Sequence, residues 1–254
     1  MSEPTTAAPT SGAAVTLVLA SASPARLTTL RRAGVEPVVV VSDVDEDAAL
    51  ERAAADAGHP LAVAEQVAVL AAAKAAAVAR RLGAGPRAAG DDAGSGRVLV
   101  LGCDSLLEVD GRAHGKPATA ERATARWRAL SGRSGVLHTG HHLLLLEPPG
   151  PRQAAGATAA ARPAAHAAVS STRVHFAEVD EEEIAAYVAT GEPLAVAGAF
   201  TLDGYGGAFV TGVEGDHHGV IGLSLPTLRT LVRAHGLRWT DLWAAPGDPG
   251  PEPA

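Results

Sequence analysis

The sequence contains little cysteine, few aromatic residues and no long run of strongly apolar side chains. Its one cysteine, Cys103, excludes an internal disulfide and favours a reducing compartment. Aromatic residues make up only 3% of the chain, so the core must be built mainly from leucine and valine. About 18 consecutive apolar residues are needed for a membrane span, and no such run occurs. Met1–Ala14 also lacks the charged start and apolar centre of a signal peptide, so we expect a cytoplasmic protein without membrane contact.

Charge and length narrow the function classes further. The formal net charge of −7 argues against a nucleic-acid partner, because such surfaces are broadly basic, but it allows a small basic pocket for an anion. The length of 254 residues suits one large domain or two lobes. We expect one domain over residues 14–243, with disordered tails at 1–13 and 244–254. Stretches rich in Gly, Ala and Pro predict flexible loops at 83–96 and 147–168.

Strand and helix signals alternate in the first part of the chain. The apolar run Val15–Ala20 predicts a strand, Ser23 followed by Pro24 is typical of a helix start, and Gly34 of a helix stop. A valine-rich strand over Glu36–Ser42 and a helix from near Leu61 to Leu82 follow.

Hairpin-like signals are added in the second part. The pattern predicts strands over 136–146 and 169–176, a helix with a capping box of Asp180 and Glu183, short strands around Gly204–Gly207, and a last helix over Pro226–His235. The whole pattern predicts an α/β fold with a mixed central β-sheet flanked by helices.

One segment in the middle of the chain is the first candidate for chemistry. The apolar run Val98–Leu101 predicts a buried strand, and Gly102 marks a place where the backbone turns or closely approaches another element. Asp104 then follows the strand end, where α/β folds usually open a cleft. Ser105–Val109 predicts a second short strand, and Asp110 with the next glycine a hairpin turn.

This hairpin would carry an acid and a base, Asp104 and Lys116, to one rim. Such a pair beside a turn suits phosphate and metal chemistry, whereas a salt bridge on the hairpin surface is the alternative. The sequence around Lys116 is not a phosphate-binding P-loop, because position 110 is aspartate rather than glycine and Pro117 replaces the serine or threonine.

The first strand–turn–helix segment is a candidate anion site. Ser21 and Ser23 offer hydroxyl groups, and the start of the helix offers free N–H groups and a favourable dipole. Arg26 lies in the first helical turn, where a cation is unfavourable unless an anion binds nearby. The alternative is an ordinary helix cap with a solvated arginine.

Lys74 and an acidic run complete the set of charged candidates. Lys74 lies on the apolar stripe of its predicted helix, so it either reaches outward to water or points into a cleft to meet an anion. The run Asp43–Asp47 lacks the glycine and glutamate of a calcium-binding loop. It is either solvated surface or a source of one carboxylate that joins Asp104 around a hard divalent ion.

Histidines supply a third possibility, a zinc site. They cluster at 138, 141 and 142 and again at 217 and 218. His138 and His142 would share one face of a strand, so a zinc ion would need further ligands from elsewhere, and Cys103 is the only thiol.

Several blocks in one order resemble the Maf (septum formation) family of nucleoside triphosphate pyrophosphatases. LASASPARLTTLRRAG is similar to the S-x-S-P-R-R segment of that family, SDVDE to its S-x-V-x-E segment, QVAVLAAAKAAAVA to its L-A-x-x-K-A helix, and GCDSLLEVDGRAHGKP to its G-A-D-T…G-K-P core. LSGRSGVLHTG, VHFAEVDEEEIAAYVATGEP, AGAF and VEGDHHGVIGLSLPTL follow in the family's order. The resemblance covers nearly the whole chain apart from the tails and the two loops.

The resemblance implies a two-lobed Maf/ITPase-like α/β fold around a cleft, in a cytoplasmic homodimer. It also implies hydrolysis of the α–β anhydride of a nucleoside triphosphate with Mg²⁺ or Mn²⁺. Asp104 would accept the proton and hold metal, with Glu46 as a second metal ligand. Lys116 and Lys74 would neutralise phosphate charge. The hydroxyls of Ser21 and Ser23, together with the Arg26 guanidinium, would bind the triphosphate.

Four positions depart from the family pattern. Ala25 replaces the first arginine of the S-x-S-P-R-R pair, Ser105 replaces the threonine of G-A-D-T, Val196 stands at a frequent lysine, and Asp203 stands where one group has glutamine. No preference for a particular base therefore follows. A nucleotide-binding regulator of cell division with weak catalysis is the alternative function, and a zinc-dependent hydrolase is a third.

Overall fold

The computed structural model describes residues 15–84, 96–146 and 164–243. The two predicted tails and most of the two predicted loops lie outside these residues. Both loop boundaries were partly wrong, because helix α3 (Val63–Ala84) continues to Ala84 and strand β6 (Ala164–Phe176) begins at Ala164. Alanine favours the helix intrinsically, and in β6 the pairing of Ala164–Ala168 with β5 overrides the weak strand preference of alanine.

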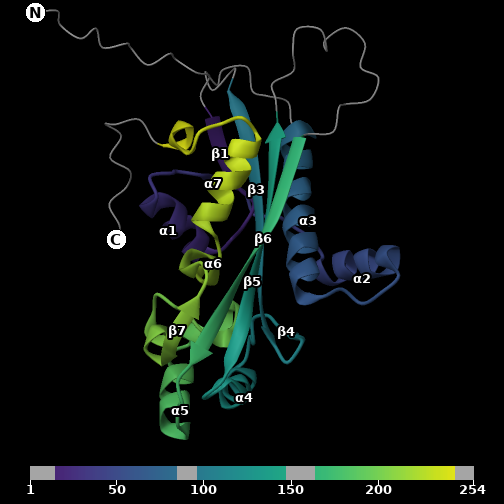
Figure 1. The fold of residues 1–254 in the computed structure, drawn as a ribbon. Helices are drawn as coiled ribbons and strands as arrows, with labels where there is room; N and C mark the ends of the chain where they lie inside the picture. The colour runs from purple at the N-terminus through teal and green to yellow at the C-terminus, as the bar shows by residue number, and fades with distance from the viewer. Residues whose placement is uncertain (1–14, 85–95, 147–163, 244–254) are drawn as a thin grey trace, which may run out of the picture.

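A seven-stranded mixed sheet forms the centre of the molecule, with the order β2-β1-β3-β5-β6-β7 and β4 paired to β3 (Figure 1). The strands β1, β2 and β3 are parallel, and the remaining pairings are antiparallel. This confirms the predicted α/β fold with a mixed sheet. Besides β6, the strands are β1 (Val15–Leu19), β2 (Val38–Val39), β3 (Arg97–Val109), β4 (Arg112–His114), β5 (Ser134–Leu146) and β7 (Val210–Glu214).

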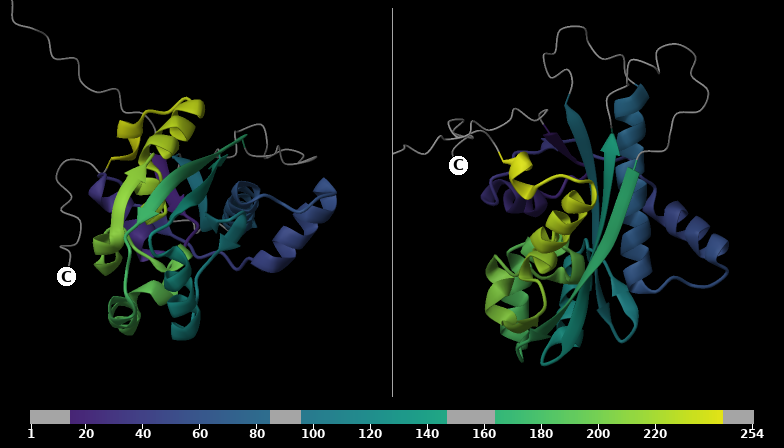
Figure 2. Two further views of the ribbon diagram at one scale, coloured as in Figure 1. Left: turned by 60° about the horizontal axis from the view of Figure 1, so that its bottom comes forward. Right: turned by 45° about the horizontal axis from the view of Figure 1, so that its top comes forward.

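Helices cover both faces of the sheet. The long helix α3 lies along one face, and α1, α6 and α7 lie on the other (Figures 1 and 2). Among the described helices, none is long and apolar enough to cross a membrane. Besides α3, the helices are α1 (Pro24–Arg32), α2 (Glu46–Ala57), α4 (Ala120–Leu130), α5 (Glu181–Ala189), α6 (His217–Ile221) and α7 (Leu225–Ala234).

The predicted break at Gly102 does not exist. Strand β3 is one continuous element of 13 residues, and Asp104 lies in its middle rather than at the end of a shorter strand. Gly102 is needed for close approach instead, because an added Cβ would overlap the carbonyl oxygen of Ala71 in α3. Pairing with β5 holds this part of β3 extended, since Gly102 lies opposite His142 and Asp104 opposite Gly140.

Two other predicted elements differ in part. The strand expected over Glu36–Ser42 shrinks to β2. Of the short strands expected around Gly204–Gly207, β7 follows that stretch, whereas Tyr205–Phe209 forms a 3₁₀ helix. Helix α2 was missed, although Asp45 caps its start by accepting a hydrogen bond from the Ala48 N–H. Its alanines carry little amphipathic pattern, so the periodicity gave no signal.

The core divides into clusters along the sheet. Leu101 and Cys103 of β3 belong to one cluster with α1 and α7, whereas Leu107 and Val109 belong to another with α4 and α5. These residues alternate along one strand, so both clusters lie on the same face. Ser105 falls between them on that face. A polar layer therefore separates the two lobes at the middle of β3.

Candidate active site

One edge of β3 is unpaired in its middle part. Strand β1 pairs with β3 only as far as Leu101, where the Ala20 N–H donates to the Leu101 carbonyl oxygen at 2.8 Å. Strand β4 begins its pairing only at Leu107. Between these two points the edge of β3 faces no strand, and the chain leaving β1 turns there into α1. The gap opens a site at Asp104 and Ser105, bordered by both lobes.

Three of the predicted charged residues meet at this gap. The Lys74 ammonium of α3 lies 2.6 Å from a carboxylate oxygen of Asp104 and 2.7 Å from one of Glu46. The Lys74 and Asp104 side chains are 13% and 11% exposed, whereas that of Glu46, in the first turn of α2, is 51% exposed. Lys74 thus does not reach outward to water, which was one of the two alternatives, and its partners here are carboxylates rather than an anionic ligand.

The surroundings of Asp104 tune its proton affinity. Burial raises the pKa of Asp104 above its ordinary value, while the Lys74 and Arg26 cations oppose this rise. A carboxylate whose pKa is raised towards neutrality is a stronger base than an ordinary surface aspartate. The site therefore holds a potential general base with a positive charge in direct contact.

Arg26 is a buried arginine whose donors are largely used within the protein. Its Nε–H donates to the Gly222 carbonyl oxygen at 2.8 Å, and Nη1 donates to Ser21 Oγ and to the Cys103 carbonyl oxygen, each at 2.9 Å. Its Nη2 donates to Ser105 Oγ at 3.1 Å. The residue is 8% exposed and no carboxylate pairs with it in the described part of the chain. This cation ties α1 to the open edge of β3 and leaves a positive charge without a counterion, which favours an anion nearby.

Ser105 belongs to a chain of hydrogen bonds in which each hydroxyl accepts from one neighbour and donates to the next. Thr139 Oγ1 donates to the Gly219 carbonyl oxygen at 2.8 Å, so the hydroxyl of Ser105 donates to Thr139 Oγ1 at 2.9 Å and accepts from Arg26. The chain links the polar layer of the sheet to α6. Sequence reasoning treated Ser105 only as a replacement for threonine, and Thr139 gave no signal because its partners are distant in sequence.

The two serines of the first turn have different roles. Ser21 is buried and accepts hydrogen bonds from the Ser23 N–H at 3.2 Å and from Arg26. Ser23 caps α1, as predicted, and accepts from the Arg26 N–H at 3.5 Å. The start of α1 contains no acidic residue, so it remains attractive to an anion.

Lys116 forms no ion pair with Asp104, so the salt-bridge alternative is wrong, and Lys74 contacts that carboxylate instead. The Lys116 side chain is exposed, and it makes no hydrogen bond or ion pair with any described residue. The backbone beside it is held: the Gly115 carbonyl oxygen accepts from Arg126 and from the Gly198 N–H, and the Ala118 N–H donates to the Leu194 carbonyl oxygen. A free ammonium on an anchored segment can reach towards a ligand in the gap.

A carboxylate that sequence reasoning missed organises the second lobe. Glu192 accepts hydrogen bonds from the hydroxyls of Thr201 and Tyr187, at 2.6 and 2.9 Å, and from the N–H groups of Tyr205 and Gly206, at 3.1 and 3.0 Å. Burial raises the pKa of Glu192, but these hydrogen bonds outweigh it and hold the pKa below its ordinary value. The glycine-rich stretch around Gly206 was the only signal in the sequence, and it was interpreted as strand.

The histidines on β5 do not form a metal centre. His138 bridges Glu108 at 2.9 Å and Ser171 at 2.8 Å, and His141 accepts from the Ser224 N–H at 2.9 Å. Burial lowers the pKa of His141 to about 4, so it stays neutral. Cys103 is fully buried, and burial raises the pKa of its thiol. His138 and His141 are therefore held by hydrogen bonds within the fold, although His141 Nδ1 is buried without a partner among the described residues.

Comparison with known proteins gives one family and consistent relatives. A family model described as "Maf-like protein" matches residues 16–235. A protein of Streptomyces avermitilis named nucleoside triphosphate pyrophosphatase is 50% identical over 227 residues, which cover 89% of this chain and 94% of that protein. A protein of the same name from Salinispora tropica is 49% identical over 237 residues, which cover 93% of this chain and 91% of that protein. Another, from Mycobacterium marinum, is 44% identical over 229 residues, which cover 90% of this chain and 97% of that protein.

Proposed function

Because this chain belongs to the Maf-like protein family and is a hydrolase of the nucleoside triphosphate pyrophosphatase class, we propose that it cleaves the anhydride between the α- and β-phosphates of its substrate. The products are a nucleoside monophosphate and pyrophosphate. The observation that supports this assignment best is the meeting of Asp104, Lys74 and Glu46 at the unpaired edge of β3. The substrate class is the nucleoside triphosphates, including modified ones.

Asp104 acts as the general base in this proposal. Its raised pKa, caused by burial, suits removal of a proton from the attacking water. Lys74 opposes this rise and favours the ionised form of Asp104, because its ammonium contacts the carboxylate directly. When a triphosphate enters, the same ammonium can turn from the carboxylates towards phosphate oxygens and offset the charge that develops on the leaving pyrophosphate.

The carboxylates of Asp104 and Glu46 fit a hard divalent cation, Mg²⁺ or Mn²⁺. Both carboxylates contact the Lys74 ammonium, at 2.6 Å for Asp104 and 2.7 Å for Glu46, so the space between the two carboxylates favours a positive charge. Carboxylate oxygens are the ligands that such cations prefer. A bound cation supplies Lewis-acid polarisation of the phosphate and lowers the pKa of a bound water.

The remaining predicted residues bind the substrate. The start of α1, with the hydroxyls of Ser21 and Ser23, faces the gap beside Arg26, whose charge lacks a carboxylate partner among the described residues. Lys116 approaches from the other border of the gap, on the segment after β4. Phosphates therefore lie between these two groups of donors in the proposed complex.

We further propose that the enzyme is cytoplasmic, acts as a homodimer and removes excess or damaged nucleotides, with a link to arrest of cell division. A catalytically weak nucleotide-binding regulator of division is the second candidate, motivated by Ala25 and Asp203, which replace an arginine and a glutamine of related patterns. Tight nucleotide binding without any turnover would support the second candidate.

The test is pyrophosphate release from a panel of canonical and modified nucleoside triphosphates in Mg²⁺ or Mn²⁺. The wild-type protein should turn over some of the panel, and Asp104→Asn should lose roughly 10²-fold or more of kcat. Asp56→Asn, an exposed carboxylate on α2, is the matched control and should keep full activity. A wild type that hydrolyses nothing, or an Asp104→Asn variant as active as wild type, would contradict the proposal.

A further inference from the structure

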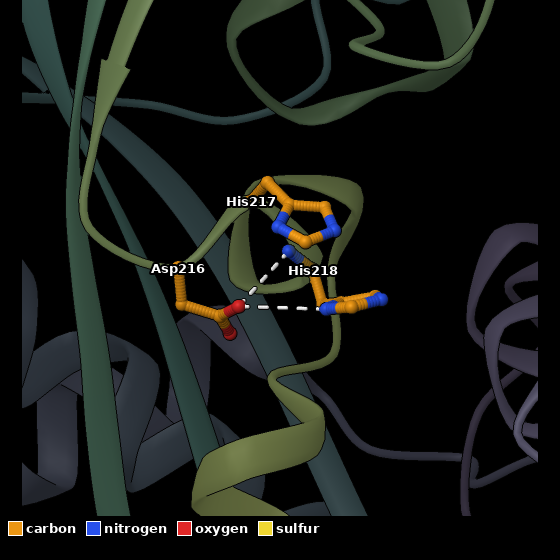
Figure 3. A group of neighbouring side chains, drawn as sticks. All are labelled: Asp216, His217 and His218. Atoms are coloured by element: carbon orange, nitrogen blue, oxygen red, sulfur yellow. Dashed lines mark hydrogen bonds and ion pairs between the residues drawn. The ribbon is translucent and has the colours of Figure 1, made fainter.

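Three side chains of the kinds that bind transition metals lie together at the start of α6 (Figure 3). Asp216, His217 and His218 each offer one ligand atom, and these atoms all lie within 4.8 Å of one another. His218 Nδ1 lies 3.5 Å from Asp216 Oδ1. These three residues are called the α6 cluster below.

The backbone under the α6 cluster is firmly held. The Asp216 N–H donates to Thr172 Oγ1, and that hydroxyl donates back to the Asp216 carbonyl oxygen, both at 3.1 Å. Thr172 is 1% exposed in β6, and Thr139 of β5 holds the Gly219 carbonyl oxygen at 2.8 Å. The cluster therefore rests on two strands of the central sheet, which is the rigid support that a metal site needs.

Hydrogen bonds orient the Asp216 carboxylate but leave some of its lone pairs available. Its oxygens accept from the N–H groups of His218 at 3.2 Å and Gly219 at 3.0 Å, which caps α6. An ionised carboxylate has about four acceptor positions, so lone pairs remain for a cation after both capping bonds are made. Hydrogen bonds to a metal-ligating side chain usually fix its orientation, and the two capping bonds do the same for the Asp216 carboxylate.

A cavity of about 240 Å³ adjoins the α6 cluster. His217 and His218 line it together with Asp203 and with Arg32 of α1. The imidazoles thus border a partly open pocket that is also lined by a guanidinium, and the pocket leaves room for a further ligand beside the three side chains. Three protein ligands with one open position form the arrangement of zinc sites that exchange a water or a substrate oxygen.

We propose that the α6 cluster binds one divalent transition-metal ion of the zinc class, with its fourth position open to this cavity. Two imidazoles and one carboxylate select zinc, cobalt or nickel over magnesium, which prefers oxygen ligands. Tetrahedral zinc at about 2.0–2.1 Å from each ligand requires ligand atoms roughly 3.3 Å apart. Closing the set to this spacing requires a rotation of the exposed His217 side chain, whose ring centroid lies 3.9 Å from that of His218.

The fourth ligand is a water molecule or an anionic oxygen, and Arg32 favours the anion. This site is distinct from the Asp104–Glu46 pair, whose donors are all oxygens. The proposal does not depend on the hydrolysis proposed above, so either one can fail alone.

The experiment measures zinc affinity of the untagged full chain by competition with a chromophoric chelator, in millimolar Mg²⁺ to occupy oxygen-only sites. Asp216→Asn is the sharpest variant, because asparagine caps a helix as well as aspartate does but is a much poorer zinc ligand. The double variant His217→Ala/His218→Ala removes the imidazoles. His59→Ala, an exposed histidine far along the chain, is the matched control.

We expect one equivalent of zinc per chain, with at least about 10-fold weaker binding in Asp216→Asn and a larger loss in the double histidine variant. His59→Ala and Asp104→Asn should bind zinc as wild type does. The Co²⁺-loaded protein should show the visible absorption of a tetrahedral ion, absent from the double variant. In addition, zinc should raise the melting temperature of wild type but not of the double variant.

Four results would overturn the proposal. One is no saturable zinc binding by the wild type, and another is unchanged affinity in the double histidine variant. The third is loss of the zinc site in Asp104→Asn, since that would place the ion at the candidate active site. If Asp216→Asn alone binds like wild type while the double variant does not, the carboxylate is only a helix cap and the proposed three-residue site is wrong.

Discussion

Replacing Lys74 with methionine tests the electrostatics of the gap in β3. Methionine keeps the apolar stem that packs on the face of α3 but removes the charge between two carboxylates. In the Lys74–Asp104 ion pair the two side chains are only 13% and 11% exposed, respectively, whereas the Glu46 side chain is 51% exposed. Most of the effect should therefore come from Asp104.

These exposures set the expected loss in the free energy of unfolding of the Lys74→Met variant. Removing one partner of a buried ion pair costs about 3–5 kcal/mol, and an exposed pair contributes about 0.2–1 kcal/mol. Because the gap is reached by water, we expect the lower end, about 3 kcal/mol in the free energy of unfolding at pH 8.

The loss should depend on pH with a definite sign. Burial holds the pKa of folded Asp104 above its ordinary value, so this group destabilises the fold as the pH rises through that pKa. Without Lys74 the pKa rises further, and the unfavourable contribution grows over a wider range of pH. When Asp104 is protonated the missing ammonium matters little, so the difference between variant and wild type should shrink towards acid pH.

Urea unfolding at pH 5 and pH 8, without added divalent metal, measures both quantities. The signal is the fluorescence of the three tryptophans, of which Trp127 is fully buried. Lys116→Met is the matched control, because that exposed lysine makes no ion pair with a described residue and should change stability by less than about 0.5 kcal/mol. A loss in Lys74→Met below about 1 kcal/mol at pH 8, or one equal at both pH values, would refute the reasoning.

Three further outcomes follow from the same geometry. The acid limb of kcat/KM should move to higher pH in Lys74→Met, because the ammonium holds the Asp104 pKa down. Gly140→Ala should lower the free energy of unfolding by about 3 kcal/mol in urea titrations, since an added Cβ would overlap the backbone of α3, whereas Gly83→Ala meets nothing and should not destabilise. Glu192→Gln should lower the free energy of unfolding at neutral pH by about 2–3 kcal/mol, because the amide nitrogen meets donors that the carboxylate accepted. Because the hydrogen bonds hold the folded Glu192 pKa below its ordinary value, this difference from wild type should shrink as the pH falls through the carboxyl range.

Part of the candidate site was predictable because its signals are local. Lys74 stood out as a charge on an apolar helical stripe, and Asp104 as a carboxylate directly after a buried apolar run. Those facts depend on spacing along one element, which the chain reports directly. The resemblance to a known family then joined residues that no local pattern connects, such as Glu46 and Asp104.

The rest depended on which elements pack together. Gly102 allowed either a turn or a close contact, and only the packing of α3 on β3 selected the contact. Arg26 was expected to bind phosphate with its guanidinium, but four of its hydrogen bonds go to Ser21, Ser105 and two carbonyl oxygens. Ser21 lies in the turn before α1, but the other partners belong to β3 and to the residue that ends α6, so the sequence near Arg26 could not indicate them.

The amino-acid sequence by itself determined where most helices begin and end, because caps and glycine stops act within a few residues. It also determined the class of the fold, since the order of apolar strands and amphipathic helices allows few topologies. Only the tertiary structure decided that Lys74, rather than Lys116, pairs with Asp104. Ion pairs between distant elements depend on the register of strands and the depth of helix packing, and both are set by the core as a whole.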